Sequence, residues 1–184
     1  MNNGRDVVLL PLKNFGEAKS RLRASSTITS VDELVRNLAR GVIMACRPRT
    51  VMILSDNEEV ATFALAEGAA YVHSPRGLNA AVQAAYDELT ADVDRVIIVH
   101  GDLLRPAGLG TYEFSTGVTV VTDRHGIGTN VLAVPTGARF QFHFGSNSAE
   151  LHEKEARRLD LPVVVERHSP WGHDVDEPDD LSGV

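Results

Sequence analysis

Short β-branched runs alternate with helical patterns through the first hundred residues, and this alternation restricts the possible folds more than any other feature. The runs that predict strands lie at 6–12, 50–55, 69–74 and 94–102. The amphipathic patterns that predict helices lie at 30–46, 57–68 and 77–90. Strands separated by such helices form parallel sheets, because each helix crosses one face of the sheet. The sequence therefore predicts an α/β fold with a three-layer, Rossmann-like sheet.

The alternation of predicted strands and helices ends after Asp102. Shorter connections join the next predicted strands, and one more helix is expected before the last strand. The strands are predicted at 116–123, 130–135, 139–144 and 162–168, and the helix at 148–160. We therefore expect a mixed sheet in this region. No internal repeat, low-complexity stretch or linker interrupts the chain, so residues 1–184 are expected to form one domain.

Charge and composition exclude several classes of protein. The formal net charge of -7 argues against a nucleic-acid-binding surface, which needs clustered Lys and Arg. No apolar run reaches the roughly 18 to 20 residues of a membrane span, and basic residues occupy the place of a signal-peptide core. The single cysteine, Cys46, lies in an apolar helical pattern and is expected in the core. We expect a cytoplasmic protein that binds neither nucleic acid nor a membrane.

A basic loop follows the first predicted strand. It carries Lys13, Lys19, Arg21 and Arg23. Ligands of open α/β sheets bind beyond the carboxyl ends of the strands, so this loop could hold phosphates, although a solvated basic loop is an equal alternative. The loop has neither the Gly-x-x-x-x-Gly-Lys-Ser/Thr pattern of P-loop NTPases nor the Gly-x-Gly-x-x-Gly pattern of dinucleotide-binding proteins.

Three aspartates are candidate metal ligands. Asp102 ends an apolar run, where a carboxylate needs a cation, a ligand or a capping role. Asp174 and Asp176 are two residues apart, so they point to the same side of an extended segment. Together these carboxylates could bind Mg²⁺, which prefers oxygen ligands. The acidic residues after Asp176 are expected instead to begin a helix after Pro178.

Two glycine-containing loops are candidate anion sites. Residues 123–130 form either a hairpin turn or a loop whose backbone amides reach an anion. Around Gly145 and Ser148 a strand is expected to end and a helix to begin, which suits either a bound phosphate or ordinary serine capping. His152 lacks the second histidine of a zinc-protease helix and is expected on the helix surface.

Motifs along nearly the whole chain resemble one known family. They are "LPLKNFGEAKSRL" at 10–22, "LSD" at 54–56, "GLNAA" at 77–81, "GDL" at 101–103, "DRHGIGTN" at 123–130, "FGSNS" at 144–148 and "DVDEPDDL" at 174–181. The sequence resembles the guanylyltransferases of deazaflavin coenzyme F420 biosynthesis, which join GTP to phosphoenolpyruvate or 2-phospho-L-lactate. The resemblance implies a nucleotidyltransferase domain with a GT-A-like sheet and a magnesium-dependent reaction that releases pyrophosphate.

The resemblance also implies roles for individual residues. The metal ligands would be Asp102, Asp174 and Asp176. The small phospho-acid would be bound by Thr129, Gly145 and Ser148. The GTP phosphates would face Lys13, Lys19 and Arg21. The nucleoside would be bound by Ser55, Gly77 and Asn79.

The sequence leaves other interpretations open. The family continues after its aspartate into Leu-Pro and a longer helical segment, whereas here Arg105 and Pro106 follow and the next strand comes early. A related nucleotidyltransferase could use the same metal residues with another phospho-acid, a sugar phosphate or another nucleotide. A catalytically inactive nucleotide-binding homologue is the alternative of a different class. A homodimer is compatible with the sequence, which does not distinguish between oligomeric states.

Overall fold

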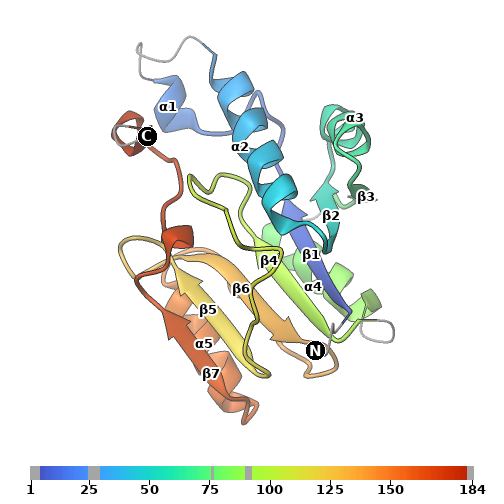
Figure 1. Cartoon of the computed structure of the whole chain (residues 1–184), viewed down its shortest axis with the longest axis vertical. Coiled ribbons are helices and arrows are strands. Elements are labelled where there is room, and N and C mark those ends of the chain that lie inside the picture. The colour runs from blue at the N-terminus through green and yellow to red at the C-terminus, as the bar shows by residue number, and fades with distance from the viewer. Residues whose placement is uncertain (1–4, 25–29, 76, 90–92, 182–184) are drawn as a thin grey trace.

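The computed structural model describes residues 5–24, 30–75, 77–89 and 93–181, with only the backbone of Ser20 and Arg21. One seven-stranded sheet has the order β3-β2-β1-β4-β6-β5-β7 (Figure 1). Its strands are β1 (Asp6–Pro11), β2 (Thr50–Ser55), β3 (Ala70–His73), β4 (Arg95–Val99), β5 (Val118–Thr122), β6 (Thr129–Pro135) and β7 (Val163–Glu166). Only β6 runs antiparallel to its neighbours. The predicted α/β fold with a mixed sheet is confirmed.

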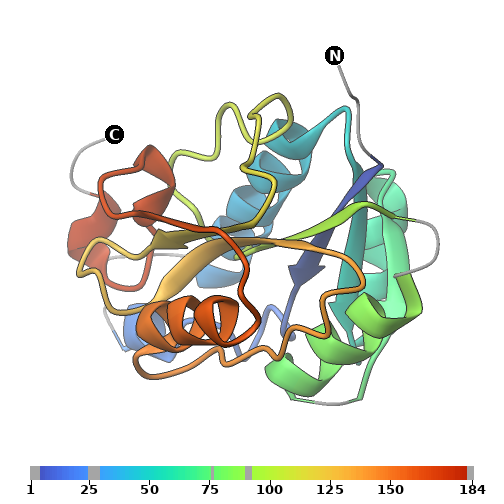
Figure 2. The same cartoon turned by 90° about the horizontal axis from the view of Figure 1, so that it is seen from below.

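Helices cover both faces of the sheet (Figure 2). They are α1 (Ser20–Arg23), α2 (Val31–Cys46), α3 (Glu58–Ala66), α4 (Leu78–Leu89) and α5 (Ser148–Arg158). Val8 and Leu10 of β1 pack in the core beneath α2 and α3, whereas Val7 and Leu9 pack beneath α4 and α5. The side chains of a strand alternate between its faces, so a buried apolar strand contributes to two core layers. Within the described residues, none of the helices is long and apolar enough to cross a membrane.

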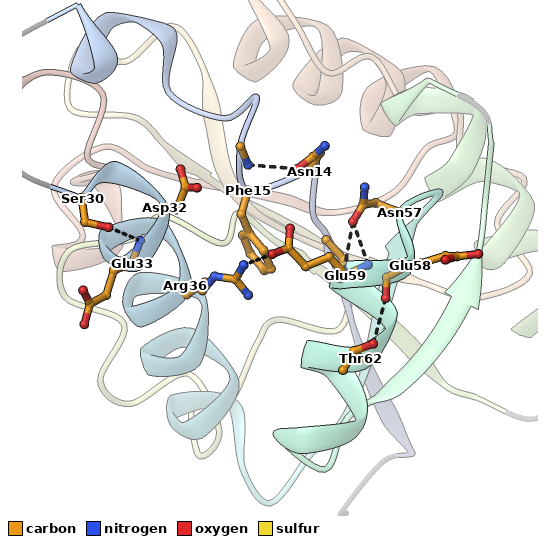
Figure 3. Close-up of polar contacts among 12 residues, drawn as sticks. Asn14, Phe15, Ser30, Asp32, Glu33, Arg36, Asn57, Glu58, Glu59 and Thr62 are labelled. Atoms are coloured by element: carbon orange, nitrogen blue, oxygen red, sulfur yellow. Dashed lines mark hydrogen bonds and ion pairs between the residues drawn. The ribbon is translucent and has the colours of Figure 1, made fainter.

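Polar side chains define where α2 and α3 begin (Figure 3). The hydroxyl of Ser30 accepts a hydrogen bond from the backbone N–H of Glu33, which is one half of a capping box. Asn57 accepts two backbone hydrogen bonds at the start of α3, one of them from Glu59 at 2.9 Å. Arg36 of α2 pairs with Glu59, so the two helix starts are joined to each other.

The prediction of a strand at 139–144 is wrong. This segment has no regular secondary structure and pairs with no strand among the described residues. Asn79 and Gln83 of α4 each donate to one backbone carbonyl of the segment and accept from one of its backbone N–H groups. Glu155 and His152 of α5 each accept from a further N–H group. Side chains of two helices thus take the place of a neighbouring strand.

Candidate functional site

A cavity of about 820 Å³ opens at the carboxyl ends of β1, β2 and β4. The chain brings parts of every sequence motif from its first half to this edge of the sheet. The polar residues that line the cavity include Lys13, Asn14, Lys19, Ser55, Asp56, Ser74, His100, Asp102 and Asp176. Ligands of parallel α/β sheets usually bind at this edge, because the loops that follow the strands meet there.

Backbone pairing brings the predicted metal ligands together. Leu103 and Asp174 form an isolated antiparallel bridge, and the N–H of Val175 donates to the carbonyl of Asp102 at 3.0 Å. One oxygen each of Asp102, Asp174 and Asp176 therefore lies within 4.8 Å of the other two. The structure thus brings these distant residues to one location, and their role as metal ligands stays a prediction.

One lysine is shared between two of the carboxylates. Lys19 forms ion pairs with Asp102 and, at 2.6 Å, with Asp176. Burial alone would lower the pKa of Lys19, but these two carboxylates raise it above its usual value. Burial, and then the charge of Asp102, raise the pKa of Asp174, although Asn130 donates to its carboxylate at 3.2 Å. The second oxygen of Asp102 is buried without a hydrogen-bond partner in the described part of the chain. A cation with oxygen ligands fits this donor set.

The basic loop divides into two parts. Lys13 is exposed and lines the cavity, and Lys19 lies at the carboxylates with 11% of its side chain exposed. Arg23 faces another way: it pairs with Asp32 of α2 and donates to the carbonyl of Ala18. The side chain of Arg21 lies outside the described residues.

Two of the three predicted nucleoside residues line the cavity. Ser55, at the end of β2, is buried, and its carbonyl accepts a hydrogen bond from the Tyr71 hydroxyl at 2.8 Å. Gly77 lies at the cavity wall just before α4. The amide of Asn79 is used elsewhere, because it accepts from the N–H of Phe144 at 2.6 Å and donates to its carbonyl at 2.9 Å.

Thr129, Gly145 and Ser148 gather at a second position. Thr129 begins β6, Ser148 begins α5, and both are buried. Gly145 has a φ of +128°, a conformation that favours glycine. These residues do not line the cavity, but His100 does, and its ring lies 5.6 Å from that of Phe144. His100 thus connects the cavity wall to the segment that precedes Gly145.

The loop between β5 and β6 is a hairpin connection. The carboxylate of Asp123 accepts from the backbone N–H groups of His125 and Ile127, at 3.1 and 2.9 Å. Two amides that could have reached an anion are therefore occupied, which favours the turn interpretation. The carbonyl of Ile127 accepts from the N–H of Ala149 at 3.1 Å and so ties this hairpin to the start of α5.

The expectation that His152 lies on the helix surface is wrong. Its side chain is completely buried beneath the sheet layer, and burial, followed by the nearby His143 and His100, lowers its pKa to about 3. Its Nδ1 lies 3.1 Å from the hydroxyl of Thr129. The spacing of Ala149, His152 and Ala156, all buried, is that of one helix face and was a signal for its position.

The acidic C-terminal stretch divides into two parts in the structure. A 3₁₀ helix (Pro178–Leu181) follows the metal-ligand candidates, close to the predicted helix start. The Asp180 carboxylate accepts from the N–H groups of Asp176 and Glu177, both at 2.8 Å, and pairs with Arg124. Asp180 therefore holds the backbone that carries Asp176.

The short segment after Asp102 packs into the core. Leu103, Leu109 and Phe114 are buried in the core beneath α2. The N–H of Gly110 donates to the carbonyl of Ala45 at 2.7 Å, and a side chain at Gly110 would collide with the backbone at Arg47. The segment thus connects β4 to β5 without the longer helix and leaves Asp102 at the cavity.

Comparison with known proteins shows the family of the chain. The family model described as "Guanylyl transferase CofC like" matches residues 6–184. A phosphoenolpyruvate guanylyltransferase of Roseiflexus castenholzii is 33% identical over 94% of this chain and 84% of its own length. A 2-phospho-L-lactate guanylyltransferase of Methanothermobacter thermautotrophicus is 28% identical over 98% of this chain and 84% of its own.

A solved structure agrees with the fold. A nucleotidyl transferase from Methanothermobacter thermautotrophicus superposes with a TM-score of 0.67 at 14% identity, and covers 97% of this chain and 94% of its own. At that identity the likeness shows the nucleotidyltransferase fold alone. With the family model matched over nearly the full length, the chain belongs to the CofC-like guanylyl transferase family.

Proposed function

We propose that this protein joins GTP to a small phospho-carboxylate, phosphoenolpyruvate or 2-phospho-L-lactate, and releases pyrophosphate. In the cell this reaction would serve the biosynthesis of the deazaflavin coenzyme F420. The observation that carries the proposal is the cluster of Asp102, Asp174 and Asp176 at one end of a cavity that also exposes Lys13 and Lys19. The names of the curated relatives support the choice of nucleotide and acceptor.

Asp102, Asp174 and Asp176 would hold Mg²⁺. The unpartnered buried oxygen of Asp102 and the raised pKa of Asp174 both indicate negative charge that a hard cation would offset. When bound, Mg²⁺ would neutralise charge on the α-phosphate and the departing pyrophosphate. Lys13 and Lys19 would hold the remaining phosphates, since each ammonium supplies point charge and hydrogen-bond donors.

The chain needs no general base for this reaction. The nucleophile would be a phosphate oxygen of the small acid, which attacks the α-phosphorus of GTP. A phosphomonoester has a second pKa of about 6, so this oxygen is mostly ionised at neutral pH. The task of the protein is then to align two polyanions, with the nucleoside near Ser55 and Gly77 and the phospho-acid near Thr129 and Ser148.

Pyrophosphate release across a panel of substrates tests the proposal. GTP, CTP, ATP and UTP would each be combined with phosphoenolpyruvate, 2-phospho-L-lactate and a sugar 1-phosphate, with Mg²⁺ and with EDTA. We expect turnover only with GTP, Mg²⁺ and a phospho-carboxylate. Turnover with a sugar phosphate or with CTP would identify a different nucleotidyltransferase. Calorimetric binding of GTP without turnover in any combination would identify an inactive nucleotide-binding homologue.

A further inference from the structure

His152 is a polar side chain enclosed in an aromatic layer. It has no exposed surface, and its ring lies 4.8 Å from that of Phe144 and 6.0 Å from that of Phe140. A buried imidazole destabilises the fold unless its nitrogens are hydrogen-bonded. Both nitrogens have partners here: the backbone N–H of His143 at 3.0 Å and the hydroxyl of Thr129 at 3.1 Å.

These partners determine which nitrogen carries the proton. The backbone N–H of His143 can only donate, so Nε2 of His152 is the acceptor and carries no hydrogen. Burial lowers the pKa of His152 to about 3, so the ring is neutral at ordinary pH. A neutral imidazole has one N–H, which must then be at Nδ1 and must be donated to the hydroxyl oxygen of Thr129.

The tautomer of His152 controls the direction of the Thr129 hydroxyl. Because this oxygen accepts from His152, its own hydrogen is left to be donated elsewhere. We propose that His152 is a positioning residue that fixes the Thr129 hydroxyl as a hydrogen-bond donor to the anionic oxygens of the phospho-acid. The inference rests on the proposed function, and it names a residue that acts through Thr129 without touching substrate.

The opposite tautomer would have the opposite effect. With the proton on Nε2, Thr129 would donate to Nδ1 and would offer only lone pairs to the ligand. Phosphate and carboxylate oxygens accept hydrogen bonds, so lone pairs facing them would weaken binding. Thr129 begins β6 and contacts α5 through His152, and Ser148 is buried at the first residue of the same helix.

Two substitutions separate this role from a structural one. In His152→Asn the amide nitrogen takes the place of Nδ1 and can still donate to Thr129, but the bond to His143 is lost. In His152→Gln the amide oxygen takes the place of Nε2 and can still accept from His143, but the donor to Thr129 is lost. KM for the phospho-acid, KM for GTP and kcat would be measured for both variants.

We expect His152→Gln to raise KM for the phospho-acid about tenfold, the size of one charge-assisted hydrogen bond, with KM for GTP within about twofold of wild type. We expect His152→Asn to keep the phospho-acid KM within about threefold. The reverse order would overturn the proposal, since it would mean that His152 matters through the segment 139–144. Thr129→Val should match His152→Gln, and the double variant should be no worse than Thr129→Val alone.

A spectroscopic measurement tests the hydrogen-bond assignment without any turnover. Nitrogen-15 NMR of the wild-type protein should show His152 neutral and protonated at Nδ1 from pH 6 to 8. Protonation at Nε2 would overturn the proposal even if every variant were unstable. Failure of the proposed function has a different signature: wild-type protein would consume no GTP with any phospho-acid, while the NMR signal would be unchanged.

Discussion

At the scale of single residues, neighbouring carboxylates near the C-terminus differ in function. Asp176 contributes an oxygen to the cluster and pairs with Lys19, whereas Asp179 is exposed on the 3₁₀ helix. We expect Asp176→Asn to abolish GTP turnover and Asp179→Asn to leave it unchanged, because only the first removes the charge of a proposed metal ligand. Both variants should unfold in urea at nearly the wild-type midpoint, since half of the Asp176 side chain is exposed (50%). If Asp176→Asn consumed GTP at the wild-type rate, the proposal that Asp176 is a metal ligand would be wrong.

His152 makes the stability of the protein depend on pH. Its pKa is lowered from 6.5 to about 3 in the folded chain, so the unfolded chain binds the proton first as the pH falls. Stability is therefore complete above pH 6.5 and is lost below it, by up to about 1.4 kcal/mol per pH unit from this group. We expect the free energy of unfolding of His152→Gln to fall less steeply between pH 6.5 and 4 than that of wild type. Equal slopes in chemical denaturation would contradict the burial of a neutral imidazole.

The sequence could predict the chemistry of residues better than their burial. From the sequence alone, Asp102 could be placed at the end of an apolar strand, and Asp174 and Asp176 on the same side of an extended segment. His152 was misjudged because its neighbours in sequence, Glu150 and Glu153, are typical of a helix surface. Its burial depends on Thr129 and His143, which only the folded chain brings to it.

At the scale of elements, the regular strands and helices were predictable and the irregular segment 139–144 was not. Strands β1, β2 and β4 are short apolar runs that are buried on both faces, so their composition alone identifies them. The alternating phenylalanines of 139–144 give the pattern of a strand, and they do pack into the core beneath α4 and α5. What the pattern cannot show is that helix side chains, and not a strand, bind the backbone.

The amide of Asn79 provides a test of how this segment is held. We expect Asn79→Ala to lower the free energy of unfolding by about 1–3 kcal/mol, because two buried backbone groups of Phe144 lose their partner. KM for the phospho-acid should rise more than KM for GTP, since Gly145 follows directly. Asn37→Ala, on the exposed side of α2, is the matched control and should change neither. A selective rise in KM for GTP would instead support the role in nucleoside binding that the resemblance implies.

At the scale of the whole molecule, the site joins parts of the chain that are far apart in sequence. Lys19 comes from the loop before α1, Asp102 follows β4, and Asp176 precedes the C-terminal 3₁₀ helix, which lies beside α1 in Figure 1. The strand ends could be predicted to meet at one edge of the sheet. The pairing of Leu103 with Asp174 could not, because it is an isolated bridge outside the regular sheet and has no sequence pattern of its own.

A cation that binds this cluster should stabilise the whole fold. The three carboxylates repel one another in the folded chain, and burial raises the pKa of Asp174, so neutralising them favours the folded state. A ligand at one hundred times its Kd contributes about 2.7 kcal/mol. For a domain of this size that corresponds to a rise in Tm of roughly 5–10 °C.

Differential scanning calorimetry with Mg²⁺, and with EDTA plus NaCl at the same ionic strength, would measure this effect. We expect the Mg²⁺-dependent rise in Tm for wild type and for Asp179→Asn, but not for Asp102→Asn or Asp176→Asn, because each of the last two removes one ligand charge. The NaCl arm separates binding from general screening, which acts on all surface charges alike. An equal rise in all four proteins would place the stabilising cation away from the cluster. No rise in any of them would mean that Lys19 alone compensates the carboxylates in the absence of GTP.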